Sequence, residues 1–257
     1  VPKGWEVLAE SSNGVIAAMM NKSRSLVATQ FHPEVHHTKD GLKMLENFLL
    51  KIADCQPNWT AGNFINDQIE KIRNFVGDGS VLTGVSGGVD STVVAALLHK
   101  AVGSRSHAVI IDHGLMRKNE VSECVDALAD GLGVNIHSYD ESKIFLSKLK
   151  GVVDPEKKRK IIGNQFIYSF DRIAMSLGKI EYLAQGTLYP DKIESGVSNG
   201  NTSQVIKSHH NVGGLPENME FKLVEPLDEL FKDEVREVGK ELGLPSKLIN
   251  RHPFPGP

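Results

Sequence analysis

The residues best suited to chemistry follow a short apolar run that ends at residue 85. Glycines there allow backbone N–H groups to approach an anion closely, and the helical pattern that follows adds unpaired N–H groups and a favourable dipole. Serine and threonine hydroxyls supply further donors. These features predict a phosphate-binding loop that consists of Ser86, Gly87, Gly88, Val89, Asp90, Ser91 and Thr92.

Asp90 has two possible roles in such a loop. Its carboxylate can cap the helix that starts here, or it can hold Mg²⁺ against phosphate oxygens. No Gly-Lys-Ser/Thr follows, so the loop is not a Walker A motif, and the G-x-G-x-x-G dinucleotide fingerprint is also missing. The cations that neutralise a bound phosphate must then come from elsewhere in the chain. An ordinary strand-to-helix turn with an aspartate cap is the alternative.

A histidine and a carboxylate lie two residues apart after another apolar run, at His32 and Glu34. The segment resembles the His-Pro-Glu motif of class I glutamine amidotransferases, and this resemblance implies a Cys–His–Glu triad in which the histidine takes the thiol proton and the glutamate orients it. A metal site that also uses His36 and His37 is the alternative. The H-E-x-x-H zinc motif needs glutamate directly after the first histidine, and Pro33 intervenes, so we do not expect zinc.

The elements that must position these residues fall into two groups. In the first, residues 1–54, apolar-rich segments at 5–11, 15–20 and 26–31 predict short strands. A helix with 3–4 residue spacing is expected from a cap at Asp40 through residue 52. Three strands and one helix with no other core are typical of the end of a larger domain.

A linker is predicted at residues 55–62, and a second domain at residues 63–257. Buried strands alternate there with helical patterns, which predicts an α/β fold with a parallel sheet covered by helices on both faces. Ligands of such sheets lie at the carboxyl ends of the strands. The stretch 186–226 is rich in Gly, Pro, Asn and Ser and predicts long loops. The expected strands are 81–85, 107–111 and 134–138, and the expected helices are 64–76, 90–102, 120–132, 142–149, 156–177 and 231–242.

Composition excludes several classes of protein. The 257 residues are 40% hydrophobic and 24% charged, with a formal net charge of −3, so disorder and a general nucleic-acid-binding role are not expected. The longest apolar run, 93–98, is too short for a membrane helix, and no signal peptide opens the chain. Only two cysteines, Cys55 and Cys124, argue against a disulfide scaffold and favour a reducing, cytoplasmic location.

The string Ser-Gly-Gly-Val-Asp-Ser at 86–91 resembles the PP-loop of the N-type ATP pyrophosphatases. Five further segments, in the same order along the chain, are similar to signatures of the GMP synthetases, and the match runs from about residue 14 to residue 257. The five segments are 154–163, 185–195, 205–216, 225–235 and 251–257.

This resemblance implies a glutamine-hydrolysing ligase of purine synthesis. ATP adenylates the O2 atom of XMP, and ammonia from glutamine then displaces AMP, giving GMP, AMP and pyrophosphate. The implied substrates are XMP, ATP and glutamine or free ammonia, with Mg²⁺, and the full-length family member is a homodimer. The nucleophilic cysteine of the amidotransferase has no match here, and neither does the C-terminal dimerisation domain. We therefore do not expect this chain alone to hydrolyse glutamine.

The resemblance also implies roles for individual residues. His32 and Glu34 are the amidotransferase triad members, and Asp90, Lys207 and Lys232 serve adenylation. Asp112, after the second strand, and Gly186 are expected at the ATP. The remaining implied residues would contact substrate or form a lid over the site. Their alternatives are a solvated helix face for the basic residues and ordinary surface or loop positions for the others. These residues are Lys158, Arg159, Lys160, Asp191, Glu194, His209 and His210.

Two other functions compete with this interpretation. Another PP-loop pyrophosphatase, such as NAD synthetase, would share the loop, and a tRNA-thiolating enzyme would need a reactive cysteine near it, for which Cys124 is the weak candidate. A non-enzymatic ATP-binding module that has lost its activity is the third possibility.

Overall fold

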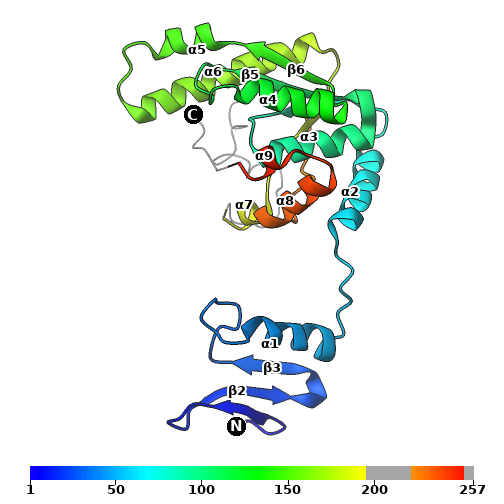
Figure 1. The fold of residues 1–257 in the computed structure, drawn as a ribbon, viewed down its shortest axis with the longest axis vertical. Helices are drawn as coiled ribbons and strands as arrows, with labels where there is room; N and C mark the ends of the chain where they lie inside the picture. Colours follow the sequence, from blue (N-terminus) through cyan, green and yellow to red (C-terminus); the bar gives the residue numbers. More distant parts are fainter. Residues whose placement is uncertain (195–220, 252–257) are drawn as a thin grey trace. The chain divides into compact units, whose positions relative to one another are not determined.

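The computed structural model describes residues 1–194 and 221–251. Contacts along the chain divide it into two compact units, Val1–Trp59 and a second that starts at Thr60. The first unit contains an antiparallel sheet in the order β1-β2-β3, followed by one helix (Figure 1). Its elements are β1 (Glu6–Glu10), β2 (Ile16–Asn21), a 3₁₀ turn (Lys22–Arg24), β3 (Leu26–Thr29), α1 (Gly41–Asn47) and a π-helical turn (Phe48–Ile52).

The first unit has almost no core of its own. Across residues 1–59, all of which the structure describes, Ala18 is the only buried apolar side chain. Asp40 occupies the N-cap position of α1, but its φ is 56° and its side chain makes no capping hydrogen bond. Because a capping side chain needs extended backbone at this position, the predicted cap at Asp40 is wrong.

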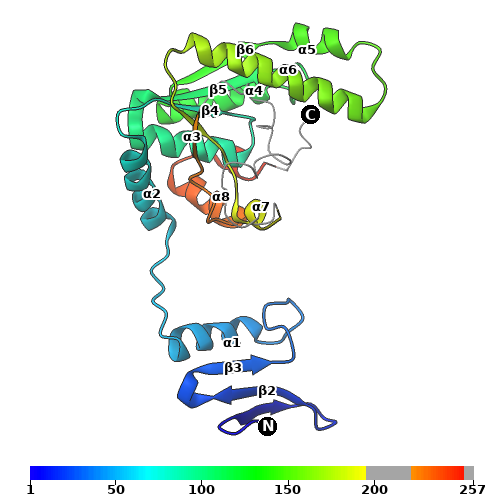
Figure 2. The same cartoon turned by 180° about the vertical axis from the view of Figure 1, so that it is seen from behind.

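The second unit contains a parallel five-stranded sheet in the order β6-β5-β4-β7-β8 (Figure 2). Its strands are β4 (Val81–Gly84), β5 (Ser106–Asp112), β6 (Ile136–Asp140), β7 (Tyr182–Ala184) and β8 (Lys222–Val224). Its helices are α2 (Ala61–Val76), α3 (Val89–Val102), α4 (Glu120–Val125), α5 (Ser142–Leu149), α6 (Pro155–Ser176), α7 (Tyr189–Glu194), α8 (Lys232–Glu241) and α9 (Ser246–Ile249), with a 3₁₀ turn at Gly103–Arg105 and a π-helical turn at Asp126–Asp130.

Successive side chains of the central strands point to opposite faces of this sheet and build two cores. Val81 and Ile110 belong to the core that α2, α3, α8 and α9 complete. Leu82 and Val109 belong to the core that α5 and α6 complete, with Phe145 as a fully buried member. Both faces of the sheet are therefore covered, which confirms the predicted α/β fold.

Some predicted boundaries are wrong. The predicted loop region 186–226 contains both α7 and the edge strand β8, and β7 was missed as well. Both missed strands have only three residues, too few to show a pattern in the sequence. The helix expected over 120–132 becomes a π-helical turn after Val125, and β6 begins two residues later than expected. Residues 54–60 have no regular secondary structure, and α2 begins at Ala61.

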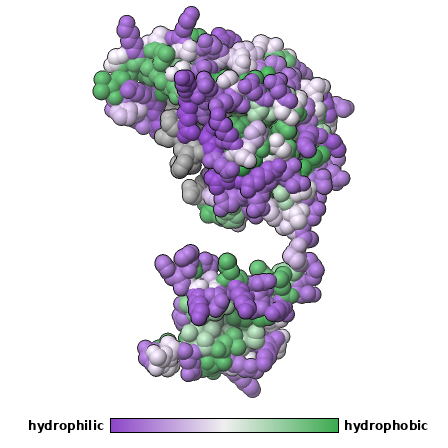
Figure 3. Space-filling model, viewed as in Figure 1, coloured by the Kyte–Doolittle hydropathy of each residue, from purple (hydrophilic) through white to green (hydrophobic). Residues whose placement is uncertain are grey.

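In the described ranges, no helix is both long enough and apolar enough to cross a membrane. In the view of Figure 3, hydrophilic side chains cover most of the visible surface of the second unit.

Candidate functional site

The loop between β4 and α3 is closed by its own hydroxyl groups. Ser91 Oγ accepts a hydrogen bond from the N–H of Ser86 (3.2 Å) and donates to the carbonyl of Gly88 (3.1 Å). Thr92 Oγ1 donates to the same carbonyl at 2.8 Å. Gly87 has a φ of +77°, a conformation that favours glycine. The first N–H groups of α3 therefore lie at the carboxyl edge of the sheet, where parallel sheets bind ligands.

Asp90 and Lys232 meet at this loop from positions 142 residues apart. Lys232, the first residue of α8, donates from Nζ to both carboxylate oxygens of Asp90, at 2.7 and 2.6 Å. Gly88 is the N-cap of α3, so the capping role considered for Asp90 is wrong, because its side chain turns to Lys232 instead. The structure thus places one predicted lysine against the loop for which phosphate binding is predicted.

Gly186 follows the short strand β7 and touches the start of α3. A Cβ on Gly186 would lie 3.2 Å from Cβ of Asp90 and 3.5 Å from the N atom of Ser91. The backbone can approach this closely because glycine has no side chain. β4 pairs with β5 on one side and β7 on the other, so the loop and Gly186 lie at the point where the strand order reverses. This is the usual ligand position in such sheets.

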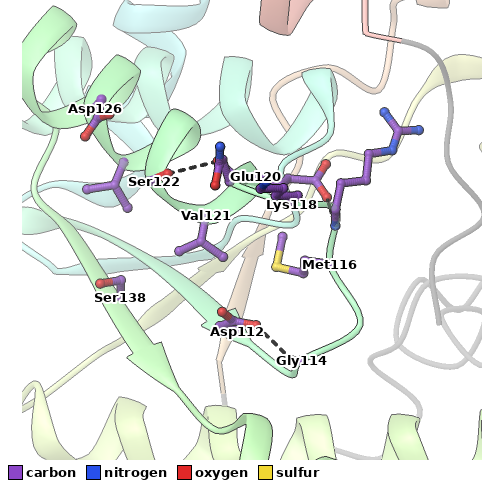
Figure 4. A pocket seen from close by; sticks show the side chains of 12 residues that line it. Asp112, Gly114, Met116, Lys118, Glu120, Val121, Ser122, Asp126 and Ser138 are labelled. Carbon is purple, nitrogen blue, oxygen red and sulfur yellow. Dashed lines mark hydrogen bonds between the residues drawn. The ribbon is translucent and has the colours of Figure 1, made fainter.

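A pocket of about 630 Å³ lies between the ends of β5 and β6 and the first turns of α4 (Figure 4). Asp112, the last residue of β5, Gly114 after it, and Ser138, from β6, form one side, and the first turns of α4 form another. Asp112 Oδ1 accepts a hydrogen bond from the N–H of Gly114 (2.8 Å), which holds the carboxylate at the pocket. The volume lies within the range of small-molecule sites. It is lined by Asp112, Gly114, Met116, Arg117, Lys118, Asn119, Glu120, Val121, Ser122, Val125, Asp126 and Ser138.

Sequence reasoning missed two residues that contact the loop. Glu120, at the start of α4, is buried and would lie 3.1 Å from a Cβ on Gly87. Arg251, after α9, donates to the carbonyl of Gly87 at 3.1 Å and to Glu120 at 2.9 Å. Arg251 opens one of the segments singled out in the sequence, but nothing local indicated its partner 164 residues away.

The basic cluster predicted as a lid lies in the first turns of α6. Lys158, Arg159 and Lys160 are exposed there, and Arg159 pairs with Glu156 at 2.8 Å. This hydrogen-bonded pair lowers the pKa of the Glu156 carboxyl and raises the pKa of the Arg159 guanidinium. Asp154 caps the helix by accepting a hydrogen bond from the N–H of Lys157 (2.8 Å).

The other predicted substrate residues are only partly described. Asp191 Oδ2 accepts a hydrogen bond from the N–H of Leu188 (2.8 Å) at the start of α7. The side chain of Glu194 and all of Lys207, His209 and His210 lie outside the described residues, so their roles stay predictions.

In the first unit, His32 and Glu34 form the expected pair. Nδ1 of His32 lies 2.7 Å from Oε1 of Glu34. A hydrogen bond from its own backbone N–H, together with His32, lowers the pKa of the Glu34 carboxyl. Thr38 Oγ1 donates to the carbonyl of His32 at 2.5 Å, and a Cβ on Gly41 would lie 2.0 Å from the carbonyl oxygen of Pro33.

Neither cysteine has the surroundings of a nucleophile. Cys124 is fully buried in α4, and this burial raises the pKa of its thiol to about 11. Cys55 is exposed near the end of the first unit, in a segment without regular secondary structure. Among the described residues, no group of three or more His, Cys, Asp or Glu side chains is placed to hold a metal ion.

Known proteins match this chain along its whole length. Residues 1–52 match the family Glutamine amidotransferase class-I, and residues 60–167 match NAD synthase. The sequences of glutamine-hydrolysing GMP synthases from Staphylococcus saprophyticus, Marinobacter nauticus and Symbiobacterium thermophilum are 55%, 54% and 54% identical over all 257 residues. The chain spans about half the length of these relatives (49–50%). The resemblance inferred from the motifs is thus confirmed over the whole chain.

Solved structures support the fold of the second unit. The NMN synthetase of Francisella tularensis is 17% identical, with a TM-score of 0.54 over 76% of each chain. The glutamine-dependent NAD⁺ synthetase of Acinetobacter baumannii, solved with ADP, is 16% identical, with a TM-score of 0.54 over 78% of this chain and 38% of that one. At these identities the likeness concerns the fold alone.

Proposed function

We propose that this chain, which is similar over its full length to glutamine-hydrolysing GMP synthases, carries the ATP-dependent step of GMP synthesis. XMP, ATP, glutamine and water are converted to GMP, AMP, pyrophosphate and glutamate. The xanthine O2 atom attacks the α-phosphorus of ATP and pyrophosphate leaves, after which ammonia displaces AMP. The observation that carries this proposal is the identity of 54–55% over all 257 residues, which include the loop at 86–92.

The loop residues hold the β- and γ-phosphates of ATP. Two sets of hydrogen-bond donors meet in this loop: the N–H groups at the start of α3 and the hydroxyls of Ser86 and Ser91. Together they stabilise the negative charge of the phosphates. These two hydroxyls lie 3.3 Å apart, a long hydrogen bond that a phosphate oxygen can replace.

Lys232 directly, and Asp90 through Mg²⁺, balance the negative charge of the phosphates at this loop. The ammonium of Lys232 stabilises the leaving pyrophosphate, and Lys207 is the second lysine proposed for this task. Asp90 fits Mg²⁺, because proteins usually bind this ion through one or two carboxylates and leave the remaining positions to substrate phosphates and water. When bound, Mg²⁺ neutralises phosphate charge. Lys232 then exchanges Asp90 for a phosphate oxygen.

The pocket next to the loop takes the adenosine part of ATP. One of its lining residues, Glu120, also contacts Gly87, which supports placing the phosphates in the loop and the adenosine in this pocket. Asp112, at the end of β5, faces the ribose or the adenine edge. Gly186 lets the chain after β7 pack against the start of α3, next to the place proposed for the triphosphate.

Glutamine hydrolysis uses His32 as the base and Glu34 to orient it. Cys55 and Cys124 are unsuited to be the nucleophile, so the thiol belongs to another part of the full-length protein. We further propose that the full-length protein is a cytoplasmic homodimer.

Two alternatives are weaker. NAD synthetase shares the fold, and residues 60–167 match that family, but the solved synthetases are only 15–17% identical to the chain. A tRNA-thiolating enzyme needs a reactive thiol at the loop, and the raised pKa of Cys124 keeps its thiol protonated at neutral pH.

The test is pyrophosphate release from Mg·ATP by the full-length protein, with XMP and ammonium. We expect Asp90→Asn to lower this rate about a hundredfold, because a group that handles phosphate charge is lost. Asp233→Asn is the matched control, since Asp233 lies on α8 beside Lys232 but is exposed and, among the residues that the structure describes, forms its ion pair with Arg236.

Release that depends on XMP and that only Asp90→Asn abolishes supports the proposal. Release with nicotinate adenine dinucleotide in place of XMP would reassign the chain to NAD synthesis. No release with either substrate would contradict both assignments.

A further inference from the structure

Arg251 joins the phosphate-binding loop to α4. Its guanidinium donates to the carbonyl of Gly87 (3.1 Å), to Oε1 of Glu120 (2.9 Å) and to Oε2 of Glu123 (2.9 Å). The Arg251 side chain is only 12% exposed and that of Glu120 only 9%. A buried, planar guanidinium that serves three acceptors has little freedom to move. Arg251 therefore holds the loop carbonyl in one direction.

The direction of the Gly87 carbonyl determines the direction of the N–H group of Gly88. The peptide between Gly87 and Gly88 is planar and trans, so its C=O and N–H point to opposite sides. Because the carbonyl points to Arg251, the N–H of Gly88 points into the loop, where Ser86 Oγ accepts it at 3.4 Å. That contact is long, and a phosphate oxygen is a stronger acceptor.

Glu120 also holds the Gly87–Gly88 peptide in place. Oε2 of Glu120 accepts the N–H of Arg117 (2.9 Å), which leaves Oε1 for Arg251. The side chain packs under Gly87, whose φ of +77° is the conformation that allows the peptide to turn. Without Arg251, the carboxylate of Glu120 would stay buried without its cation, which is unfavourable.

We propose that Arg251 is a positioning residue for ATP, which orients the Gly87–Gly88 peptide so that its N–H faces the phosphates. The proposal rests on the nucleotide-binding role proposed above for the loop. A residue that merely fastened the end of α9 to α4 would stabilise the fold without changing the affinity for ATP.

The test compares Arg251→Met, Arg251→Lys and the control Lys247→Met in the full-length protein. Lys247 pairs with Glu123 from the far side, is 73% exposed and lies outside the site. We expect Arg251→Met to raise the KM for ATP and the Kd for Mg·ATP about tenfold or more, as for loss of a charged hydrogen bond. The KM for XMP should change less. Arg251→Lys should give a smaller rise, because one ammonium cannot serve both Gly87 and Glu120.

Three measurements distinguish a positioning role of Arg251 from a merely structural one: the KM for ATP, the Kd for Mg·ATP and the melting temperature. An unchanged KM and Kd for ATP in both Arg251 variants, with a melting temperature lowered at most as in Lys247→Met, would overturn the proposal. If Arg251→Met does not fold, Arg251→Lys alone decides by the same criterion. Calorimetric binding of Mg·ATP needs no XMP, so a wild-type protein that binds ATP but releases no pyrophosphate would contradict the proposed function and still test Arg251.

Discussion

At the scale of single residues, glycines determine where functional groups can lie. Gly87 and Gly186 let the backbone turn and approach at the phosphate-binding loop. Gly41 has a similar task in the first unit, because the carbonyl oxygen of Pro33 occupies the place of its missing side chain. Pro33 lies between His32 and Glu34, so Gly41 sets the position of this pair.

The substitution Gly41→Ala tests this role. A Cβ only 2.0 Å from the Pro33 oxygen must push the loop away, and a misplacement of about 1 Å in a catalytic group costs about a hundredfold in rate. In the full-length protein we expect glutamine-dependent GMP formation to fall by about this factor, while ammonium-dependent formation stays. The control is Gly62→Ala in α2, where a Cβ meets only ordinary contacts and should stabilise the helix by up to about 1 kcal/mol. Equal loss of both activities would refute the role of Gly41.

The cysteines provide a second prediction at this scale. Since burial raises the pKa of Cys124 to about 11, only a small fraction of its thiol is ionised at pH 8. We expect iodoacetamide to label Cys55 and to leave Cys124 unlabelled in the native protein, as read by peptide mass spectrometry. Both should react in denaturant. Rapid native labelling of Cys124 would revive the thiolating alternative.

At the scale of elements, α6 has positive side chains at its N-terminus, where they are repelled by the helix dipole. Four basic residues at 157–160 lie in its first turns, next to the positive end of the helix dipole. The cap at Asp154 and the pair between Glu156 and Arg159 offset part of this repulsion. Such an arrangement favours an anionic ligand, which agrees with a substrate-binding role for Lys158, Arg159 and Lys160.

A pair of capping variants tests that role. Asp154→Ala and Thr60→Ala each remove one side-chain cap, so each should lower the free energy of unfolding by about 1 kcal/mol in urea titrations. Only Asp154→Ala loosens the basic turn. We expect it alone to raise the KM for XMP or ATP severalfold. Unchanged KM values in both variants would leave the cluster as a solvated helix face.

At the scale of the whole molecule, both cores of the sheet belong to the second unit. Every buried apolar residue of these cores follows Thr60. Residues 53–59, which precede it, are exposed and have no regular secondary structure. The second unit therefore contains all the packing that its sheet requires.

Limited proteolysis of the full-length protein tests this independence. We expect a nonspecific protease to cut early within residues 53–59, because an exposed backbone without regular secondary structure opens into a protease at little cost. The fragment that begins near Thr60 should still release pyrophosphate with XMP and ammonium, while synthesis from glutamine is lost if the cut separates the units. Loss of the ammonium reaction on cleavage would show that the sheet needs the first unit.

Several features of this protein follow from local sequence. The phosphate-binding loop, the longer helices of the second unit and the pair of His32 and Glu34 depend on neighbours within a few residues. Hydrophobic periodicity and glycine spacing record such neighbours directly. The parallel sheet with helices on both faces follows from the alternation of these elements.

Other features depend on residues that are distant in the sequence. β7 and β8 become strands because β4 and the sheet edge offer them partners, since three residues carry too weak a preference of their own. Lys232 reaches Asp90, and Arg251 reaches Gly87, across more than 140 residues. Contacts of this kind leave no periodic signal in one sequence, because their geometry arises only when the strands are ordered and the helices are packed.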